Sequence, residues 1–166
     1  MFERRGCDVL RLRFRYAADH WFLDAEDEAQ FAEIFSDGQD IFDQALTLEE
    51  ERWVWLIGKS LGTLPMAGAL AAQVQAVPDV RGVWLTPGLL KTPLPERLSK
   101  LSLPSILVLG TEGPCNLPEL PTPYAARPDF ALYLVQGVDH RFRHVDWAKA
   151  IAEAAGLNED WVASSA

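Results

Sequence analysis

The stretch from residue 53 to residue 62, Trp-Val-Trp-Leu-Ile-Gly-Lys-Ser-Leu-Gly, constrains the fold of this chain more than any other. Its first five residues are apolar, and such a run is short enough for a β-strand that is buried on both faces. Gly58-Lys59-Ser60-Leu61-Gly62 follows at once, and then an alanine-rich stretch that is typical of a helix. The order of strand, Gly-x-Ser-x-Gly and helix is the context that a nucleophile elbow requires.

A nucleophile elbow holds its serine in a strained backbone conformation, so the residues two before and two after it must be small. Gly58 and Gly62 meet this requirement around Ser60. The free N–H groups and positive dipole end of the following helix favour an oxyanion that develops beside the serine. The sequence therefore predicts Ser60 as a nucleophile, with an ordinary strand-to-helix turn as the alternative.

The rest of the chain alternates short apolar runs with segments of helical spacing. We expect strands at 8–16, 53–57, 83–86, 105–109 and 131–135, and helices at 1–6, 26–48, 61–77, 95–101 and 144–155. Asp37-Gly38 is expected to interrupt the helix at 26–48. This alternation predicts an α/β fold with a predominantly parallel five-stranded sheet and flanking helices. A length of 166 residues fits one domain over 1–157, followed by a frayed tail at 158–166.

Charge and composition argue against several classes of protein. The formal net charge of −9 disfavours nucleic acid as a partner, because phosphate binding needs clustered Lys and Arg. No apolar run reaches the length of a membrane span, and the first residues lack the apolar core of a signal peptide. Cys7 and Cys115 lack metal-ligand spacing and indicate free thiols in a reducing compartment. We therefore expect a cytoplasmic protein that binds neither nucleic acid nor membrane.

A serine hydroxyl becomes an effective nucleophile only when a base takes its proton. Three histidines are available. His20 lies in an aromatic loop, His144 is expected at the start of the last helix, and His140 follows the last predicted strand. In hydrolases with a Gly-x-Ser-x-Gly elbow the base follows the serine in chain order. The sequence therefore favours His140 as the base for Ser60.

Three motifs make the chain similar to the α/β-hydrolase fold, and in particular to its small dienelactone-hydrolase-like bacterial members. They are Gly58-Lys59-Ser60-Leu61-Gly62-Thr63, Trp84-Leu85-Thr86-Pro87-Gly88-Leu89-Leu90 and Gly137-Val138-Asp139-His140-Arg141-Phe142. The resemblance covers nearly all of residues 1–155. It implies that Ser60 is the nucleophile, His140 the base and the Leu61 backbone N–H an oxyanion donor. The implied reaction is hydrolysis of a small carboxylic ester or thioester, with no metal or organic cofactor.

The chain departs from the family pattern at the third catalytic group. The family places an aspartate after the strand that precedes the histidine strand, in a Gly-x-x-Asp-Pro pattern. This chain has Gly110-Thr111-Glu112-Gly113-Pro114, so Gly113 occupies the aspartate position. Glu112 is the nearest carboxylate and either orients His140 or faces solvent in the loop. Asp139 is disfavoured because neighbouring side chains in an extended chain diverge.

A second departure lies at the front of the fold. The family has a further strand, with a loop that supplies another oxyanion donor, and both would precede Met1. Without that strand, the first strand of this chain either leaves a gap or pairs directly with the strand at 53–57. Direct pairing gives a sheet in chain order, in which successive right-handed crossovers place the first four helical connections on one sheet face. Only the helix at 144–155 would then remain to cover the other face, so we expect a large uncovered apolar patch there.

This patch predicts either a fragment with a mis-assigned start or a homodimer through the uncovered sheet face. Together, the two departures keep a second function open. The chain would then be a catalytically inactive α/β-hydrolase-like module for binding or assembly.

Overall fold

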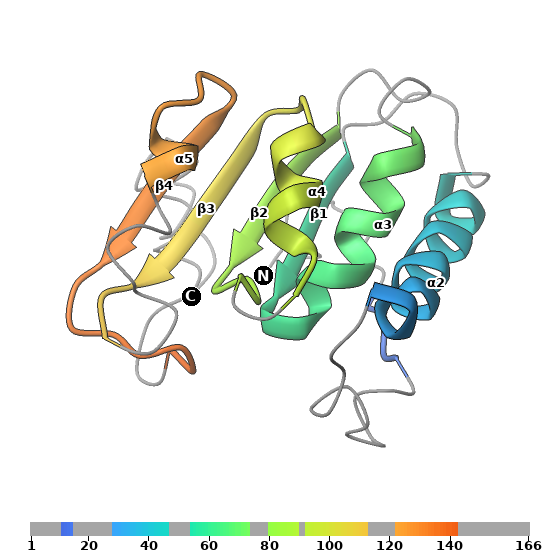
Figure 1. Ribbon diagram of the computed structural model, residues 1–166, viewed down its shortest axis with the longest axis horizontal. Helices are drawn as coiled ribbons and strands as arrows, with labels where there is room; N and C mark the ends of the chain where they lie inside the picture. The colour runs from blue at the N-terminus through green and yellow to red at the C-terminus, as the bar shows by residue number, and fades with distance from the viewer. Residues whose placement is uncertain are drawn as a thin grey trace, which may run out of the picture.

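The computed structural model describes residues 11–14, 28–46, 54–73, 80–89, 92–112 and 122–142, and it shows an α/β arrangement (Figure 1). In chain order the elements are α2 (Glu28–Leu46), β1 (Val54–Lys59), the 3₁₀ turn η3 (Ser60–Gly62), α3 (Thr63–Gln73), β2 (Val80–Leu85), α4 (Leu94–Lys100), β3 (Ser105–Gly110), α5 (Thr122–Ala125) and β4 (Phe130–Val135). The strands form one sheet in the order β1-β2-β3-β4, and every neighbouring pair is parallel. The chain therefore moves one strand across the sheet at each connection, as the sequence predicts.

Four of the expected strands correspond to β1, β2, β3 and β4, which confirms the α/β class and the parallel sheet. The fifth strand is not confirmed. Residues 11–14 of the predicted strand at 8–16 form no strand, and the rest of that range lies outside the described residues. The predicted helices at 1–6 and 144–155 and the tail at 158–166 also lie outside them. The single domain over 1–157 stays a prediction.

Helix α2 corrects one expectation from the sequence. Asp37-Gly38 was expected to interrupt the helix, but α2 runs through both residues without a break. The glycine is explained by packing, because a Cβ at Gly38 would lie 1.9 Å from the carbonyl oxygen of Pro65 in α3. Gly38 therefore allows two helices to approach closely, and it does so without ending its own helix.

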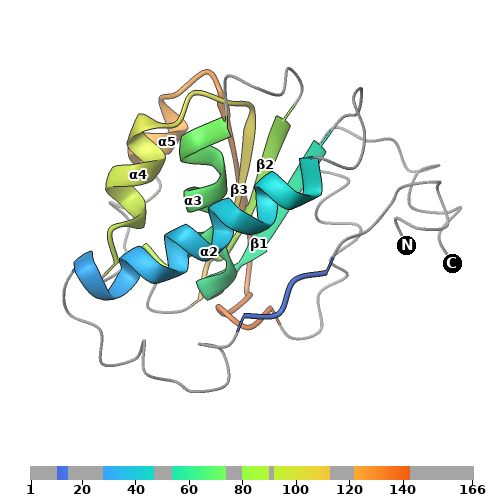
Figure 2. The ribbon, with the colours of Figure 1, turned by 90° about the vertical axis from the view of Figure 1, so that its right-hand side faces the viewer.

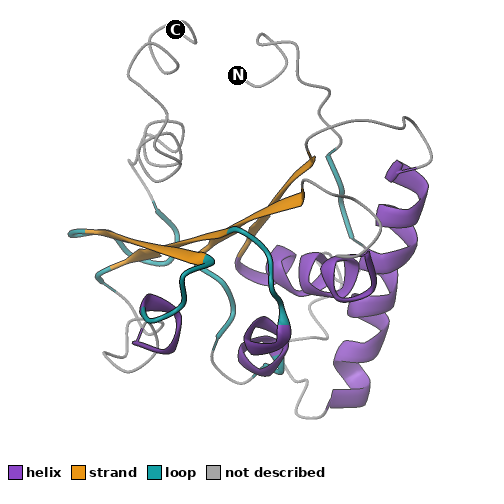
Figure 3. Ribbon diagram, turned by 90° about the horizontal axis from the view of Figure 1, so that it is seen from above, coloured by secondary structure: helices purple, strands orange, loops and turns teal. Residues whose placement is uncertain are grey.

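Helices α3, α4 and α5, which connect the four strands, lie on one side of the sheet (Figure 3), as successive right-handed crossovers in one direction require. Helix α2 crosses α3 (Figure 2) and lies beside it at the β1 end of the sheet (Figure 1). Alternate strand residues face the helices and form the larger core with them. Its fully buried members include Ile34, Leu64, Leu70, Trp84, Leu94, Leu98 and Leu107. Of the helices that the structure describes, none is long and apolar enough to span a lipid bilayer.

The opposite face of the sheet is not the bare apolar surface that the sequence predicts. Val83, Leu85, Ile106 and Val108 are buried there, in a second cluster with Phe142. The expected large patch is therefore wrong for the central strands. Trp55 and Ile57 on β1 point to the same face and are 37% and 42% exposed. A homodimer through this face stays a prediction, now confined to the edge formed by β1.

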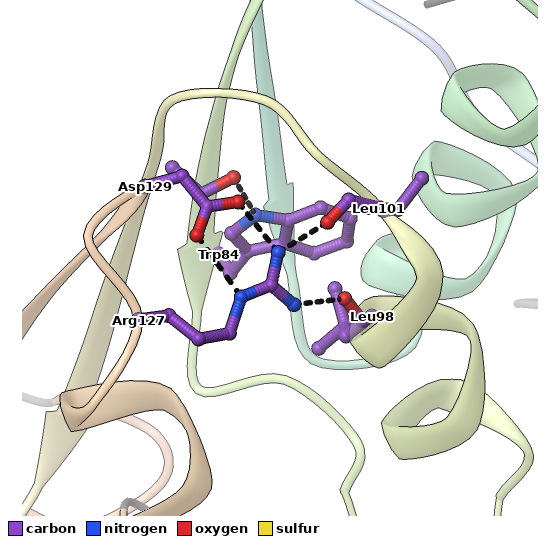
Figure 4. A network of polar contacts seen from close by, with 6 residues as sticks. Trp84, Leu98, Leu101, Arg127 and Asp129 are labelled. Carbon is purple, nitrogen blue, oxygen red and sulfur yellow. Dashed lines mark hydrogen bonds and ion pairs between the residues drawn. The ribbon is translucent and has the colours of Figure 1, made fainter.

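Arg127 fixes the amino-terminal end of the sheet (Figure 4). Its guanidinium donates to the carbonyl oxygens of Leu98 and Leu101 at the end of α4 and to the carboxylate of Asp129. It also lies 4.4 Å from the centre of the Phe130 ring. The hydrogen bond from Arg127 holds the pKa of Asp129 below its usual range. These contacts satisfy carbonyls that a helix end leaves open and join α4 to β4.

The close approach of α2 and α3 makes a prediction about stability. A Cβ at Gly68 would lie 2.1 Å from the carbonyl oxygen of Phe35 in α2, so Gly68→Ala must push the helices apart. Overpacking of this kind costs about 1–3 kcal/mol, and we expect urea unfolding to show a loss of that size. Gly88→Ala is the control, because its Cβ would meet only the Thr92 methyl, at 3.7 Å. Equal stability of the two variants would contradict the packing described here.

Candidate active site

Ser60 lies at a sharp turn between β1 and the helical segment that follows. Its φ is +52°, a conformation that residues other than glycine rarely adopt, whereas Lys59 before it is still extended. A Cβ at Gly58 would lie 2.8 Å from the carbonyl oxygen of Gly62, so the turn leaves no room for a side chain there. The buried Thr63 hydroxyl donates a hydrogen bond to the carbonyl oxygen of Ser60. These features are those of the elbow that the sequence predicts.

His140 meets Ser60 although eighty residues separate them in the chain. The Ser60 Oγ and the His140 Nε2 are 2.8 Å apart, which is hydrogen-bond distance for a nucleophile and its base. Both side chains are half-buried. Nε2 accepts the hydroxyl proton when the neutral ring carries its own proton on Nδ1. The structure thus brings together the two residues that the sequence selects, while His20 and His144 lie outside the described residues.

The base has to cross the sheet to reach the serine. Ser60 follows β1 at one edge of the four described strands, and His140 follows β4 at the other. Three strand spacings amount to roughly 14 Å, which the loop after β4 must span along the carboxyl ends of the strands. Figure 1 shows this loop, in orange-red, turning back from β4 below the strand ends.

The end of β3 supports the loop as it crosses. The Gly137 N–H donates to the Thr111 hydroxyl at 2.8 Å, and the Glu112 N–H donates to the carbonyl oxygen of Val138 at 2.9 Å. A Cβ at Gly110 would lie 2.2 Å from that same carbonyl oxygen. The last residue of β3 must therefore be glycine for the loop to pass this close.

A tight turn holds His140 at the far side of the crossing. One carboxylate oxygen of Asp139 accepts the backbone N–H groups of Arg141 at 2.9 Å and Phe142 at 3.0 Å. Phe142 has a φ of +52°, and its ring is buried against the second face of the sheet. Lys59 donates from Nζ to the carbonyl oxygen of Arg141 at 2.9 Å. The turn is therefore anchored both to the core and to β1.

The surroundings of His140 favour its neutral form. Burial lowers the pKa of His140 below its usual value, and the nearby Lys59 ammonium lowers it further. The Asp139 carboxylate opposes both effects without reversing them. Burial also lowers the pKa of Lys59, again against the effect of Asp139. A neutral imidazole can accept a proton, which is what a general base must do.

Backbone strain concentrates at this edge of the sheet. The non-glycine residues with positive φ in the described part of the chain are Ser60, Thr86 and Phe142. Thr86 directly follows β2, beside the end of β1, and is 2% exposed. Its hydroxyl makes no hydrogen bond with any described residue. Strained residues and unsatisfied buried groups gather at functional sites more than elsewhere, which agrees with a site at the carboxyl ends of the strands.

Leu61 is the second residue of the 3₁₀ turn η3. Backbone N–H groups in the first turn of a helix have no partner within that helix. A backbone N–H at such a position can donate to an oxyanion that forms beside the preceding side chain. The family's other oxyanion loop has no counterpart among the residues that the structure describes.

The structure does not bring Glu112 to His140. The Glu112 side chain is exposed, and within the described residues it makes no hydrogen bond to the imidazole. The contact of Glu112 with this region is through its backbone, which supports Val138. Asp139 affects His140 through its charge, while its oxygen forms the turn.

The sequence alone assigned no role to three residues that contribute to the site. Gly110 had a usable signal, because a glycine at the end of a strand often marks a close backbone approach. Asp139 also had one, since aspartate commonly accepts backbone N–H groups two and three residues on. Lys59 had none, because a lysine at a variable position of the elbow motif is normally a solvated side chain.

Comparisons with known proteins add no family assignment. No protein-family model and no curated protein matches this chain. The resemblance to α/β-hydrolases therefore stays a prediction that rests on the motifs. In the described part of the chain, no cluster of three or more His, Cys, Asp or Glu side chains is arranged to hold a metal ion.

The close contact at Gly110 predicts a variant that separates the catalytic pair. The Cβ of Gly110→Ala must displace Val138 and with it the loop that carries His140. We expect labelling of Ser60 by a fluorophosphonate to slow by about tenfold or more, because small misplacements of catalytic groups are costly. Gly88→Ala serves again as the control. An unchanged labelling rate in Gly110→Ala would show that the loop does not need this close passage.

The exposed carboxylate of Glu112 predicts that this side chain does not contribute to the reaction of Ser60. We expect Glu112→Gln to label within about twofold of the wild-type rate, as surface substitutions away from a site commonly do. The measurement is the second-order rate of fluorophosphonate labelling at neutral pH. A large loss would show instead that the glutamate reaches His140 during the reaction, as the other alternative from the sequence requires.

Proposed function

We propose that this chain is a serine hydrolase of the α/β-hydrolase type that cleaves a small carboxylic ester or thioester. The observation that carries the proposal is the 2.8 Å contact between Ser60 Oγ and His140 Nε2 at a strained strand-to-helix turn. A surface serine and histidine have no need of a positive φ or of a loop that crosses the sheet. Strain that persists at one serine is the expected signature of an activated nucleophile.

The proposed reaction begins when His140 Nε2 takes the proton from Ser60 Oγ as this oxygen attacks the acyl carbon. The tetrahedral oxyanion accepts a hydrogen bond from the Leu61 N–H. The imidazolium then gives its proton to the leaving alcohol or thiol as the bond to the acyl carbon breaks. Water, deprotonated by His140, attacks the acyl-serine, and the returning proton restores the Ser60 hydroxyl.

A second candidate function is a binding or assembly module that has lost its activity. The exposed Glu112 side chain and Gly113 at the usual aspartate position favour it. Loss of the acid in a triad lowers the rate greatly but does not abolish it, because the oxyanion hole and binding still contribute. The intact pair of Ser60 and His140 therefore makes the hydrolase the better proposal.

The proposal extends to location and assembly. Cys7 and Cys115, which lack the spacing of a disulfide framework or a metal site, support a reducing compartment and hence the cytoplasm. Trp55 and Ile57 support a homodimer through the β1 edge, because exposed large apolar side chains commonly mark an interface.

Labelling with a fluorophosphonate probe tests the enzyme directly. We expect the wild-type chain to form one adduct at Ser60, Ser60→Ala to form none, and His140→Gln to slow labelling by roughly 10²–10⁴-fold, the usual contribution of a general base. Ser99→Ala is the matched control, because Ser99 is an exposed serine on α4 that bonds only within its own helix turn. Intact-mass spectrometry counts the adducts.

Two results would count against the hydrolase. A folded wild-type chain that never labels supports the binding module. Labelling that persists in Ser60→Ala shows that another residue is the nucleophile.

A further inference from the structure

Lys59 is the last residue of β1 and directly precedes the proposed nucleophile. Its Nζ reaches the carbonyl oxygen of Arg141 at 2.9 Å, across eighty-two residues of sequence. Arg141 is the neighbour of His140 in the Asp139 turn. One side chain therefore joins the strand that carries Ser60 to the turn that carries its base.

The His140 turn needs a contact with β1 because its loop starts at the other edge of the sheet. The loop leaves β4 at the opposite edge of the described sheet, and its supports on the way, Gly110, Thr111 and Glu112, all belong to the end of β3. These contacts fix the loop two strands away from Ser60. A hydrogen bond from β1 itself fixes the distance between Ser60 Oγ and His140 Nε2, across which the proton would be transferred. Hydrogen bonds from a charged donor are the stronger ones, so an ammonium suits this task.

We propose that Lys59 is a positioning residue of this site, which holds the His140 turn against Ser60 through the Arg141 carbonyl and keeps the imidazole in its neutral form. The inference rests on the proposed function, since it concerns the residue that sets the position and protonation of His140, the proposed base.

The electrostatic part of the proposal follows from the charges around the imidazole. Lys59 approaches from β1 and lowers the pKa of His140, in the same direction as burial, while Asp139 from the same turn raises it. Glu112 after β3 and Arg141 beside His140 also carry charges near the carboxyl ends of the strands. A cation beside the imidazole disfavours the imidazolium. The base therefore stays neutral to a lower pH than an ordinary histidine.

The first test follows the labelling rate of Ser60 against pH. Lys59→Met removes the charge and the donor but keeps most of the aliphatic stem. We expect labelling on the high-pH plateau to slow by about tenfold, the loss expected for one hydrogen bond to a charged group. We also expect the acid limb of the profile to move to higher pH. Lys59→Arg keeps a cation and a donor, so its acid limb should stay where the wild type has it.

The matched control is Lys100→Met. Lys100 is an exposed lysine at the end of α4, paired with Glu96, and lies toward the amino-terminal ends of the strands. We expect its profile to equal that of the wild type. Lys59 is itself exposed, so its variants should fold, and thermal unfolding checks this. Lys59→Gln gives a second neutral variant should the methionine disturb the turn.

The second test needs no activity. The ring signals of His140, one of three histidines in the chain, are titrated by NMR in the wild type, Lys59→Met and Lys59→Arg, with His140→Gln for assignment. We expect the wild-type midpoint to lie below the usual value of about 6.5. The midpoint should rise in Lys59→Met and should not rise in Lys59→Arg.

The two tests fail in different ways. If Ser60 never labels but the His140 midpoint rises in Lys59→Met, the hydrolase proposal fails and the electrostatic role of Lys59 stands. If Lys59→Met keeps both the wild-type midpoint and the wild-type plateau rate, the lysine is a bystander and the inference is overturned. A midpoint that rises equally in Lys100→Met would also overturn it, because the effect would then be one of net charge.

Discussion

The site depends on a constraint set by strand order. Because β1 to β4 follow the sequence across the sheet, the strand that carries Ser60 and the strand that precedes His140 lie at opposite edges of the described sheet. The loop after β4 must therefore pass the end of β3 to bring His140 to Ser60. The glycine at position 110, the Asp139 turn and the reach of Lys59 all serve that crossing.

The crossing also links the site to the core. Ser60 and Phe142 both have positive φ, and each such residue costs of order 1–3 kcal/mol. The buried ring of Phe142 recovers about 1.5–3 kcal/mol by packing on the second sheet face, so the cost of its own backbone is offset locally. The turn is thus held by the core that covers Val83 and Val108. A change in that core would reach His140 through Arg141, the one residue between it and Phe142.

The sequence indicated the parts that depend on local pattern. Short apolar runs marked β1 to β4, and the small residues around Ser60 marked the elbow. Both signals are local, because the spacing of apolar residues and the steric requirement for small residues in a tight turn extend over only a few positions. The expectations that failed depend on packing at a distance. Asp37-Gly38 was expected to interrupt a helix, but Gly38 instead allows the close approach of Pro65. The sheet face with Val83 and Val108 was expected to be bare, but both residues are buried. Lys59 could not be assigned, because its partner lies eighty-two residues away.

The charges around His140 bear on which step of the proposed reaction the base assists most. Burial and Lys59 lower the pKa of His140 more than Asp139 raises it, so the imidazole is a weaker base and its imidazolium a stronger acid. Removing the serine proton becomes the harder step, while protonating the leaving group becomes the easier one. On the proposed mechanism the burial and charges around His140 therefore shift its contribution from removing the serine proton toward protonating the leaving group.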